Sequence, residues 1–187
     1  MSPPMMNTFV VYVENKPGVL TRVASLFRRR AFNIDSLTVG RTEKPEVSRM
    51  TITVDADRDQ ARRIEANLYK LVNVLLVENI THQPAIIRDL AMIKVAATHD
   101  ARSHVLELAS VFRARVVDVA PDSLTIEITG AEDKIDGLLE VLRPYGVLEM
   151  VRTGIVAMRR GSKSSAVVSS GNSLAHMAAD DDVSQSV

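Results

Sequence analysis

The apolar residues in the first half of the chain switch between a strand-like and a helix-like spacing. Positions 8–14 form a β-branched run, and Met50, Ile52 and Val54 alternate with threonines, which is typical of half-buried strands. Between these strands, from Gly18 onward, the apolar side chains fall on one face of a helix. The expected elements are a strand at 8–14, a helix at 18–30, strands at 33–41 and 48–55, a helix at 57–72 and a strand at 74–80.

The same order of elements recurs in the second half of the chain. It predicts a strand at 90–97, a helix at 102–113, strands at 116–119 and 123–129, a helix at 132–142 and a strand at 147–158. Apolar residues of the third strand and second helix keep one spacing in both halves. They are Met50, Ile52, Val54, Ile64 and Leu68, matched by Leu124, Ile126, Ile128, Leu138 and Leu142. Each half is a β-α-β-β-α-β unit, so we expect an α+β protein of two tandem ferredoxin-like units.

The composition changes at the C-terminal end. Residues 161–187 are rich in serine, contain the acidic run 180–182 and hold few large apolar side chains. Such a segment buries too little apolar area to offset the entropy of ordering it. We therefore expect a first domain at 7–82, a second domain at 88–160 and a flexible, disordered tail at 161–187.

Composition and charge exclude several classes of protein. The 187 residues hold no cysteine, which excludes disulfides, zinc ribbons, iron–sulfur clusters and a cysteine nucleophile. Lys+Arg and Asp+Glu number 23 each, and zero net charge argues against a nucleic-acid backbone as the main partner. The longest apolar run, at 9–13, is too short to span a membrane, and no secretory signal is visible. We expect a soluble, cytoplasmic protein with neither a membrane nor a nucleic acid as partner.

Residues with catalytic chemistry are present but are not grouped along the sequence. The histidines share no metal-ligand spacing; they are His82, His99, His104 and His176. No motif for a serine nucleophile or a dinucleotide occurs. Phe9 and Tyr12 differ in parity along the first strand and face opposite ways, which disfavours RNA binding by base stacking. We expect no catalytic residue and no metal site.

The turn at 15–18 is the segment most suited to binding a ligand. Pro17 and Gly18 lie between the end of a predicted strand and the start of a predicted helix. The first N–H groups of a helix lack partners within the helix and favour a carboxylate. Asn15 and Asn33 offer amide donors and carbonyl acceptors beside it. A zwitterionic amino acid needs both kinds of group. The alternative is a tight turn with Asn15 as a cap, and the residues themselves leave both interpretations open.

Each predicted unit is small for independent stability. Its sheet has one uncovered face and exposed edge strands, which invite pairing with another chain or with the other unit. We therefore expect a homodimer.

Several segments, taken in order, resemble one family. The turn Asn15-Lys16-Pro17-Gly18-Val19-Leu20 is similar to that of the ACT domain, a ferredoxin-like module that senses small ligands, usually amino acids. Over about residues 7–161 the chain resembles the regulatory small subunit of acetolactate synthase, also called acetohydroxyacid synthase. The segments that carry this resemblance lie at 14–23, 32–39, 48–52, 71–74, 112–119, 152–156 and 160–161.

The resemblance implies a non-catalytic subunit in the biosynthesis of valine, isoleucine and leucine. In this family the large subunit carries thiamine diphosphate, a divalent metal and usually FAD, so no cofactor is expected on this chain. The small subunit stimulates the large subunit and mediates feedback inhibition by a branched-chain amino acid, most often valine. The effector lies between the ACT domains of two chains, which implies a homodimer through these domains.

The resemblance also assigns an effector site by position. Asn15, Gly18, Val19 and Leu20 would line one side, and Asn33 and Ile34 of the second chain the other. The second unit has neither proline nor glycine at 97–102, so it would be ACT-like without an effector site. The alternative function is a stand-alone ACT protein that binds amino acids and has no enzyme partner.

Overall fold

The structure, a computed structural model, describes residues 5–161. These residues divide into two compact units. The first unit holds 5–35, 39–85 and 159–161, and the second unit holds 36–38 and 86–158. The predicted flexible tail lies outside the described residues from position 162 onward. Within residues 5–161, no helix is both long and apolar enough to cross a membrane.

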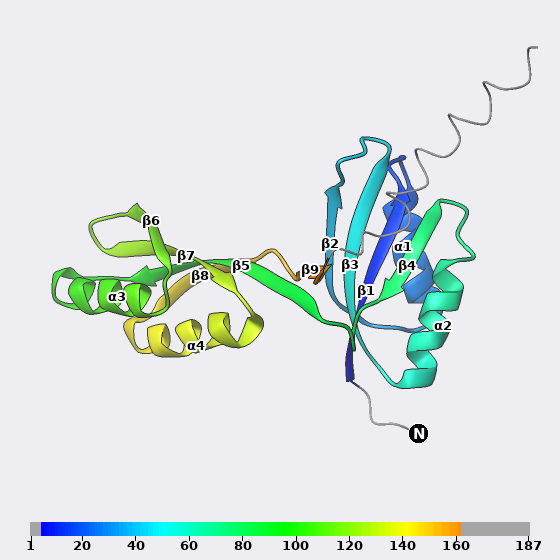
Figure 1. Ribbon diagram of the computed structural model, residues 1–187. Helices are drawn as coiled ribbons and strands as arrows, with labels where there is room; N and C mark the ends of the chain where they lie inside the picture. The colour runs from blue at the N-terminus through cyan, green and yellow to red at the C-terminus, as the bar shows by residue number, and fades with distance from the viewer. Residues whose placement is uncertain (1–4, 162–187) are drawn as a thin grey trace, which may run out of the picture. The chain divides into compact units, whose positions relative to one another are not determined.

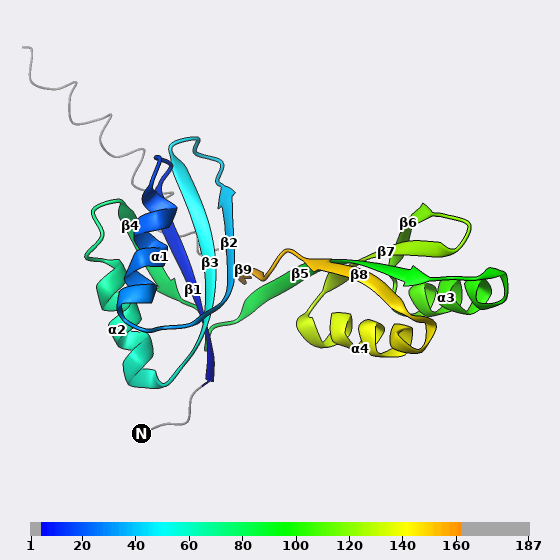
Figure 2. The same ribbon diagram turned by 180° about the vertical axis from the view of Figure 1, so that it is seen from behind.

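The first unit is a four-stranded antiparallel sheet with two helices on one face (Figures 1 and 2). The strands are ordered β2-β3-β1-β4, which is the predicted ferredoxin-like arrangement. Its elements are β1 (Met5–Glu14), α1 (Val19–Arg29), β2 (Ile34–Arg41), β3 (Val47–Ala56), α2 (Arg58–Leu68) and β4 (Val74–Asn79).

The core of the first unit lies between this sheet and its helices. Phe9 of β1 pairs with Ile52 of β3, and both side chains are fully buried. The periodic apolar faces of α1 and α2 cover them. Those buried helix residues are Val19, Val23, Leu26 and Phe27 of α1 with Ala61, Ile64 and Leu68 of α2.

The second helix begins as predicted but ends earlier. Asp57 caps it, because its Oδ1 accepts the Gln60 N–H at 2.8 Å while Gln60 Oε1 accepts the Asp57 N–H at 2.9 Å. The expectation that the helix continues to Val72 is wrong, since α2 ends at Leu68 and Val72 is 90% exposed. The chain has to turn there toward β4. The Tyr69 hydroxyl holds this turn by donating to the Val77 carbonyl oxygen at 3.0 Å.

The second unit repeats the arrangement, with strand order β6-β7-β5-β8 and an added strand, β9, paired with β5 (Figure 1). Both helices again lie on one side of the sheet. Its elements are β5 (Ala85–Ala96), α3 (His99–Val111), β6 (Arg115–Val119), β7 (Ser123–Gly130), α4 (Glu132–Leu142), a 3-10 turn η1 (Arg143–Tyr145), β8 (Val147–Arg152) and β9 (Val156–Arg159).

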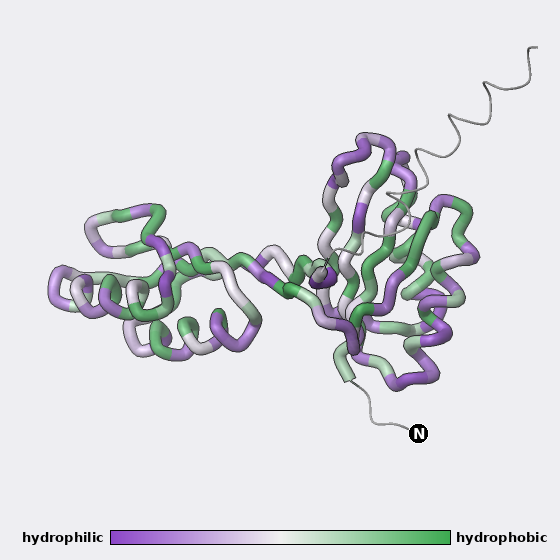
Figure 3. Tube along the Cα trace, in the orientation of Figure 1, coloured by the Kyte–Doolittle hydropathy of each residue, from purple (hydrophilic) through white to green (hydrophobic). Residues whose placement is uncertain are grey.

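The register of the strands confirms the predicted repeat. Ile126 of β7 pairs with Ile93 of the central strand β5, as Ile52 pairs with Phe9 in the first unit. All four side chains are fully buried. Along the chain, the hydropathy colouring of Figure 3 alternates between apolar and polar segments in both units. Each unit therefore has its own apolar core.

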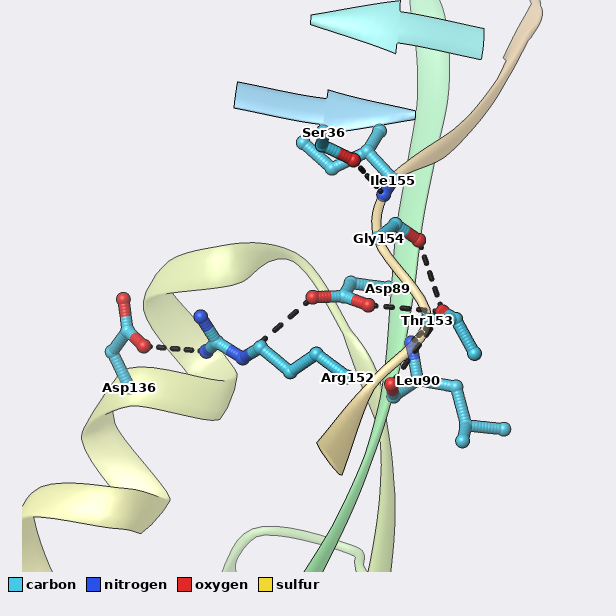
Figure 4. Close-up of polar contacts among 8 residues, drawn as sticks. All are labelled: Ser36, Asp89, Leu90, Asp136, Arg152, Thr153, Gly154 and Ile155. Atoms are coloured by element: carbon cyan, nitrogen blue, oxygen red, sulfur yellow. Dashed lines mark hydrogen bonds and ion pairs between the residues drawn. The ribbon is translucent and has the colours of Figure 1, made fainter. Parts of the chain in front are cut away.

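The predicted single strand at 147–158 is wrong, because β8 ends at Arg152 and β9 begins at Val156. Gly154 has a left-handed φ of 85°, and an added Cβ would lie 2.6 Å from Ser36 Oγ. Ile155 donates its N–H to that oxygen at 3.0 Å (Figure 4). The Ile155 carbonyl oxygen accepts from Thr38 Oγ1 at 2.7 Å. These contacts replace the ladder hydrogen bonds of a continuous strand.

A buried carboxylate fixes the residues just before this break. Asp89 is 5% exposed, and its Oδ1 accepts from Thr153 Oγ1 at 3.1 Å (Figure 4). Arg152 lies between two carboxylates, with Nε 3.7 Å from Asp89 Oδ2 and a terminal nitrogen bonded to Asp136 of α4. The break therefore has a defined, hydrogen-bonded geometry.

Candidate functional site

The turn between β1 and α1 is shaped by one glycine. Gly18 is the N-cap residue of α1 and has φ 81°, in the left-handed region that most side chains avoid. An added Cβ would meet no atom within 4 Å. Backbone conformation rather than crowding therefore favours glycine here, and the space beside Gly18 is open.

The N-terminus of α1 is available to an anion. No side chain caps it, and its first turn contains no acidic residue. The Val19 N–H reaches only the Lys16 carbonyl oxygen, at 3.4 Å. The next N–H groups have no partner one turn earlier in a helix, and the helix dipole adds partial positive charge. This end of α1 has the properties of a carboxylate site.

Asn15 joins this turn to the loop between β2 and β3. Its backbone N–H donates to the Glu46 carbonyl oxygen at 2.7 Å, and its side-chain nitrogen donates to the Pro45 carbonyl oxygen at 2.9 Å. One of the two side-chain N–H donors predicted to serve a ligand is thus used within the chain. Its carbonyl oxygen is the group suited to accept from an ammonium.

The structure separates the six predicted site residues into two groups. Asn15, Gly18 and Leu20 lie together at the start of α1, where Leu20 is 45% exposed; Val19 packs into the core at 4% exposure. Asn33 and Ile34 lie beyond the other end of this 11-residue helix, roughly 16 Å away along its axis. One chain therefore does not bring the two groups into one site.

Sequence reasoning missed a polar network beside this turn. Asn73 donates its side-chain N–H to the Glu14 carboxylate and accepts from the Arg22 guanidinium at 2.7 Å. The Asn73 bond and then the Lys16 ammonium lower the pKa of Glu14. Asn73 precedes β4, far along the chain, and only the pairing of β1 with β4 brings it here. No local spacing in the sequence could have found it.

The second unit fills the corresponding corner with its own side chain. The Ala97 N–H donates to the Asp122 carbonyl oxygen at 2.8 Å, as Asn15 does to Glu46 in the first unit. From the first turn of α3, a terminal nitrogen of Arg102 lies 3.2, 2.6 and 2.7 Å from the carbonyl oxygens of Ala97, Ala120 and Pro121. A cation thus satisfies the carbonyl oxygens that surround this corner.

The histidines and carboxylates form no metal site in the part of the chain that the structure describes. No group of three or more His, Asp or Glu side chains has the geometry to hold an ion between residues 5 and 161. His99 is fully exposed and lies 3.6 Å from Asp100, its neighbour in sequence. His176 lies outside the described residues.

The described residues thus form two tandem ferredoxin-like units, and the helix N-terminus beside Gly18 in the first unit is open. Family models agree with this division. Residues 9–76 match the "AHAS small subunit-like ACT domain", and residues 88–161 match the "Small subunit of acetolactate synthase".

Relatives and a solved structure extend this similarity over most of the chain. A probable acetolactate synthase small subunit from Archaeoglobus fulgidus is 50% identical over 159 residues, covering 85% of this chain and 99% of the relative. The acetolactate synthase small subunit of Mycolicibacterium smegmatis is 46% identical, covering 84% and 92%. The crystal structure of the Thermotoga maritima small subunit matches with a TM-score of 0.79 and 38% identity, covering 85% and 99%. This chain belongs to the family of acetolactate synthase small subunits.

Proposed function

We propose that this chain is a non-catalytic regulatory subunit that binds the large, catalytic subunit of acetolactate synthase. It stimulates that thiamine diphosphate-dependent enzyme and conveys feedback inhibition by valine in branched-chain amino-acid biosynthesis. The thiamine diphosphate, divalent metal and FAD of the reaction belong to the large subunit. Family membership supports the partner, and the uncapped N-terminus of α1 at Gly18 is the observation that carries the effector site.

The chemistry of the turn matches an amino acid at neutral pH. The free N–H groups of α1 and the positive end of its dipole favour the carboxylate. The side-chain carbonyl oxygen of Asn15 is an acceptor for the ammonium. Leu20, which is 45% exposed beside the turn, offers apolar surface to a branched side chain.

The separation of the two groups of site residues supports a homodimer through the ACT domains, residues 7–82. Asn33 and Ile34 lie at the far end of α1 from Gly18, so they complete the site only from a second copy. Such an arrangement couples effector binding to the contact between chains. A ligand that binds two states of an assembly differently shifts it by about 1–3 kcal/mol. This coupling is how valine would change the activity of the large subunit.

A matched pair of variants tests the effector site. Gly18→Asn and Gly18→Asp have nearly the same shape, and both residues tolerate the left-handed region better than other side chains. The aspartate alone places a negative charge where the carboxylate is expected to bind. We expect it to weaken valine binding by at least about tenfold relative to the asparagine variant, measured by calorimetry on the full chain. Equal affinities for the two variants would contradict the site assignment.

Co-expression with the large subunit tests the partner separately. The complex should co-elute in gel filtration, and the large subunit should be more active with this chain than without it. Both Gly18 variants should still stimulate the enzyme, while Gly18→Asp should reduce inhibition by valine. Valine binding without co-elution or stimulation would instead identify a stand-alone amino-acid-binding protein.

A further inference from the structure

A cationic groove lies in the first unit where α1 and α2 end. Its volume is about 390 Å³, comparable to small-molecule sites in other proteins. The lining combines three cationic side chains, one amide and two leucines, and contains no carboxylate. The residues are Leu26, Arg29, Arg30, Asn67, Lys70 and Leu71. The hydropathy colouring of α2 shows polar stretches between its apolar residues (Figure 3).

A buried amide holds two of these cations in place. Asn67 is only 9% exposed, and its Nδ2 donates to the Arg63 carbonyl oxygen at 2.7 Å, which fixes the orientation of the amide. Its Oδ1 accepts from an Arg30 terminal nitrogen at 3.3 Å and from Lys70 Nζ at 3.5 Å. Two positive charges are therefore gathered on one neutral oxygen.

No carboxylate of the described residues lines this groove. Within residues 5–161, none of the ion pairs involves Arg29, Arg30 or Lys70. Like charges held close together repel each other, and an anion placed between them offsets this repulsion because it attracts each of them. Arg29, Arg30 and Lys70 are all exposed, so this attraction weakens as salt is added.

The helix dipole favours a cation at the end of α1, where Arg29 lies in the last turn, but it does not require three cations at one place. Cations are favourable at helix C-termini, yet α3 and α4 of the second unit end without a basic residue in their last turn. The last carbonyl oxygens of α1 are also satisfied by the chain, since Leu26, Phe27 and Arg28 accept from the backbone N–H groups that follow. The cations are thus not required to end the helix, and few free carbonyl oxygens remain to repel an anion.

We propose that this groove binds a small phosphate-bearing anion. Guanidinium groups match phosphate oxygens in a two-pronged geometry, and lysine adds a point charge. Three cations converging on one groove suit a multivalent anion better than a single carboxylate. The groove lies at the opposite end of α1 from Gly18, at the end where Asn33 and Ile34 follow the helix, and the proposal rests on the lining of the groove rather than on the proposed valine site.

Calorimetry on the full chain at low ionic strength tests the proposal, with inorganic phosphate and pyrophosphate as the probes. We expect both to bind, with pyrophosphate the tighter of the two, and binding to weaken as salt is added. Arg30→Gln and Lys70→Gln should each reduce pyrophosphate affinity about tenfold or more, because each removes a charge-assisted hydrogen bond.

Matched controls distinguish a groove from the general positive charge of the helices. Arg28→Gln and Arg62→Gln remove the same charge from exposed positions of α1 and α2 that do not line the groove. They should change the affinity less than threefold, roughly the effect of screened surface charges. Equal losses in controls and groove variants would overturn the proposal, as would failure of both probes to bind the unaltered chain. Intact phosphate binding by Arg30→Gln together with weaker co-elution with the large subunit would show a contact for protein carboxylates and would also overturn it.

Discussion

The turns that join the first strand to the first helix can be compared between the two units, hydrogen bond by hydrogen bond. The Glu14 N–H donates to the Asn73 carbonyl oxygen at 2.9 Å, and the Ala96 N–H donates to the Gly146 carbonyl oxygen at 2.8 Å. The N–H of the next residue, Asn15 or Ala97, donates to a carbonyl oxygen in the loop between the second and third strands of its unit, that of Glu46 or Asp122. The backbone framework of this corner is therefore the same.

The two units differ in what occupies that framework. The first unit has two further residues, Pro17 and Gly18, before its helix begins, and the space beside Gly18 is open; neither α1 nor α3 has a side-chain cap. In the second unit α3 begins at His99, and Arg102 turns back onto the carbonyl oxygens of the corner. One fold thus provides an open site in one copy and a filled, stabilising corner in the other. A short insertion and one side chain make the difference.

The largest change in stability is expected when the side chain that fills the corner of the second unit is removed. Arg102→Ala leaves three carbonyl oxygens without their charged partner, so it should lower the free energy of unfolding by about 2–3 kcal/mol. Asn15→Ala removes one exposed neutral hydrogen bond and should cost only about 0.5–1 kcal/mol. Urea unfolding monitored by circular dichroism measures both. Equal costs for the two variants would show that Arg102 does not hold its corner.

A smaller change in stability is expected, of the same size in both units. Ala31 and Arg113 each follow the end of the unit's first helix with a left-handed φ, 54° and 51°, where glycine is favoured. Ala31→Gly and Arg113→Gly should each stabilise the chain by about 0.5–1 kcal/mol, because the relieved strain exceeds the entropy cost of glycine. Ala24→Gly, inside α1, is the control and should destabilise by about 1 kcal/mol. Thermal unfolding checks all three, and destabilisation by the first two variants would contradict the prediction.

The smallest effect is a dependence of stability on acidic pH. We expect it in the first unit alone, because Ala96 occupies the position in the second unit that Glu14 occupies in the first. The Asn73 hydrogen bond lowers the pKa of Glu14 below its ordinary value of 4.5. A depressed pKa means that the stabilisation is fully present above the unfolded-state value and is lost as the pH falls through the folded-state value. Asn73→Ala should move the pKa of Glu14 toward 4.5 and reduce this dependence, with the contribution of Lys16 remaining. A carboxyl NMR titration of both proteins measures it, and an unchanged pKa in the variant would rule out Asn73 as the cause.

Local pattern explains most of the fold that could be predicted. The alternation of Met50, Ile52 and Val54 places β3 correctly. The expectation of a half-buried strand is wrong, because Thr51 and Thr53 on its other face are buried as well. Asp57 marks the start of α2, because its cap is made with Gln60, three residues away. The end of α2 and the break at Gly154 were mispredicted, since they depend on Val77 and Ser36, which are distant in sequence.

In the candidate site, as in the fold, the local features could be predicted and the long-range contacts could not. Gly18 and Asn15 could be found from the sequence because a turn that needs a left-handed residue is a local property. The sequence alone also determined the repeated units and the lack of a Pro-Gly turn in the second. Only the tertiary structure brought Asn73 to Glu14, Arg102 to the carbonyl oxygens of Ala120 and Pro121, and Arg30 to Asn67. Those contacts join elements far apart in the chain, and strand pairing and helix packing, rather than any local spacing of residues, decide which side chains meet.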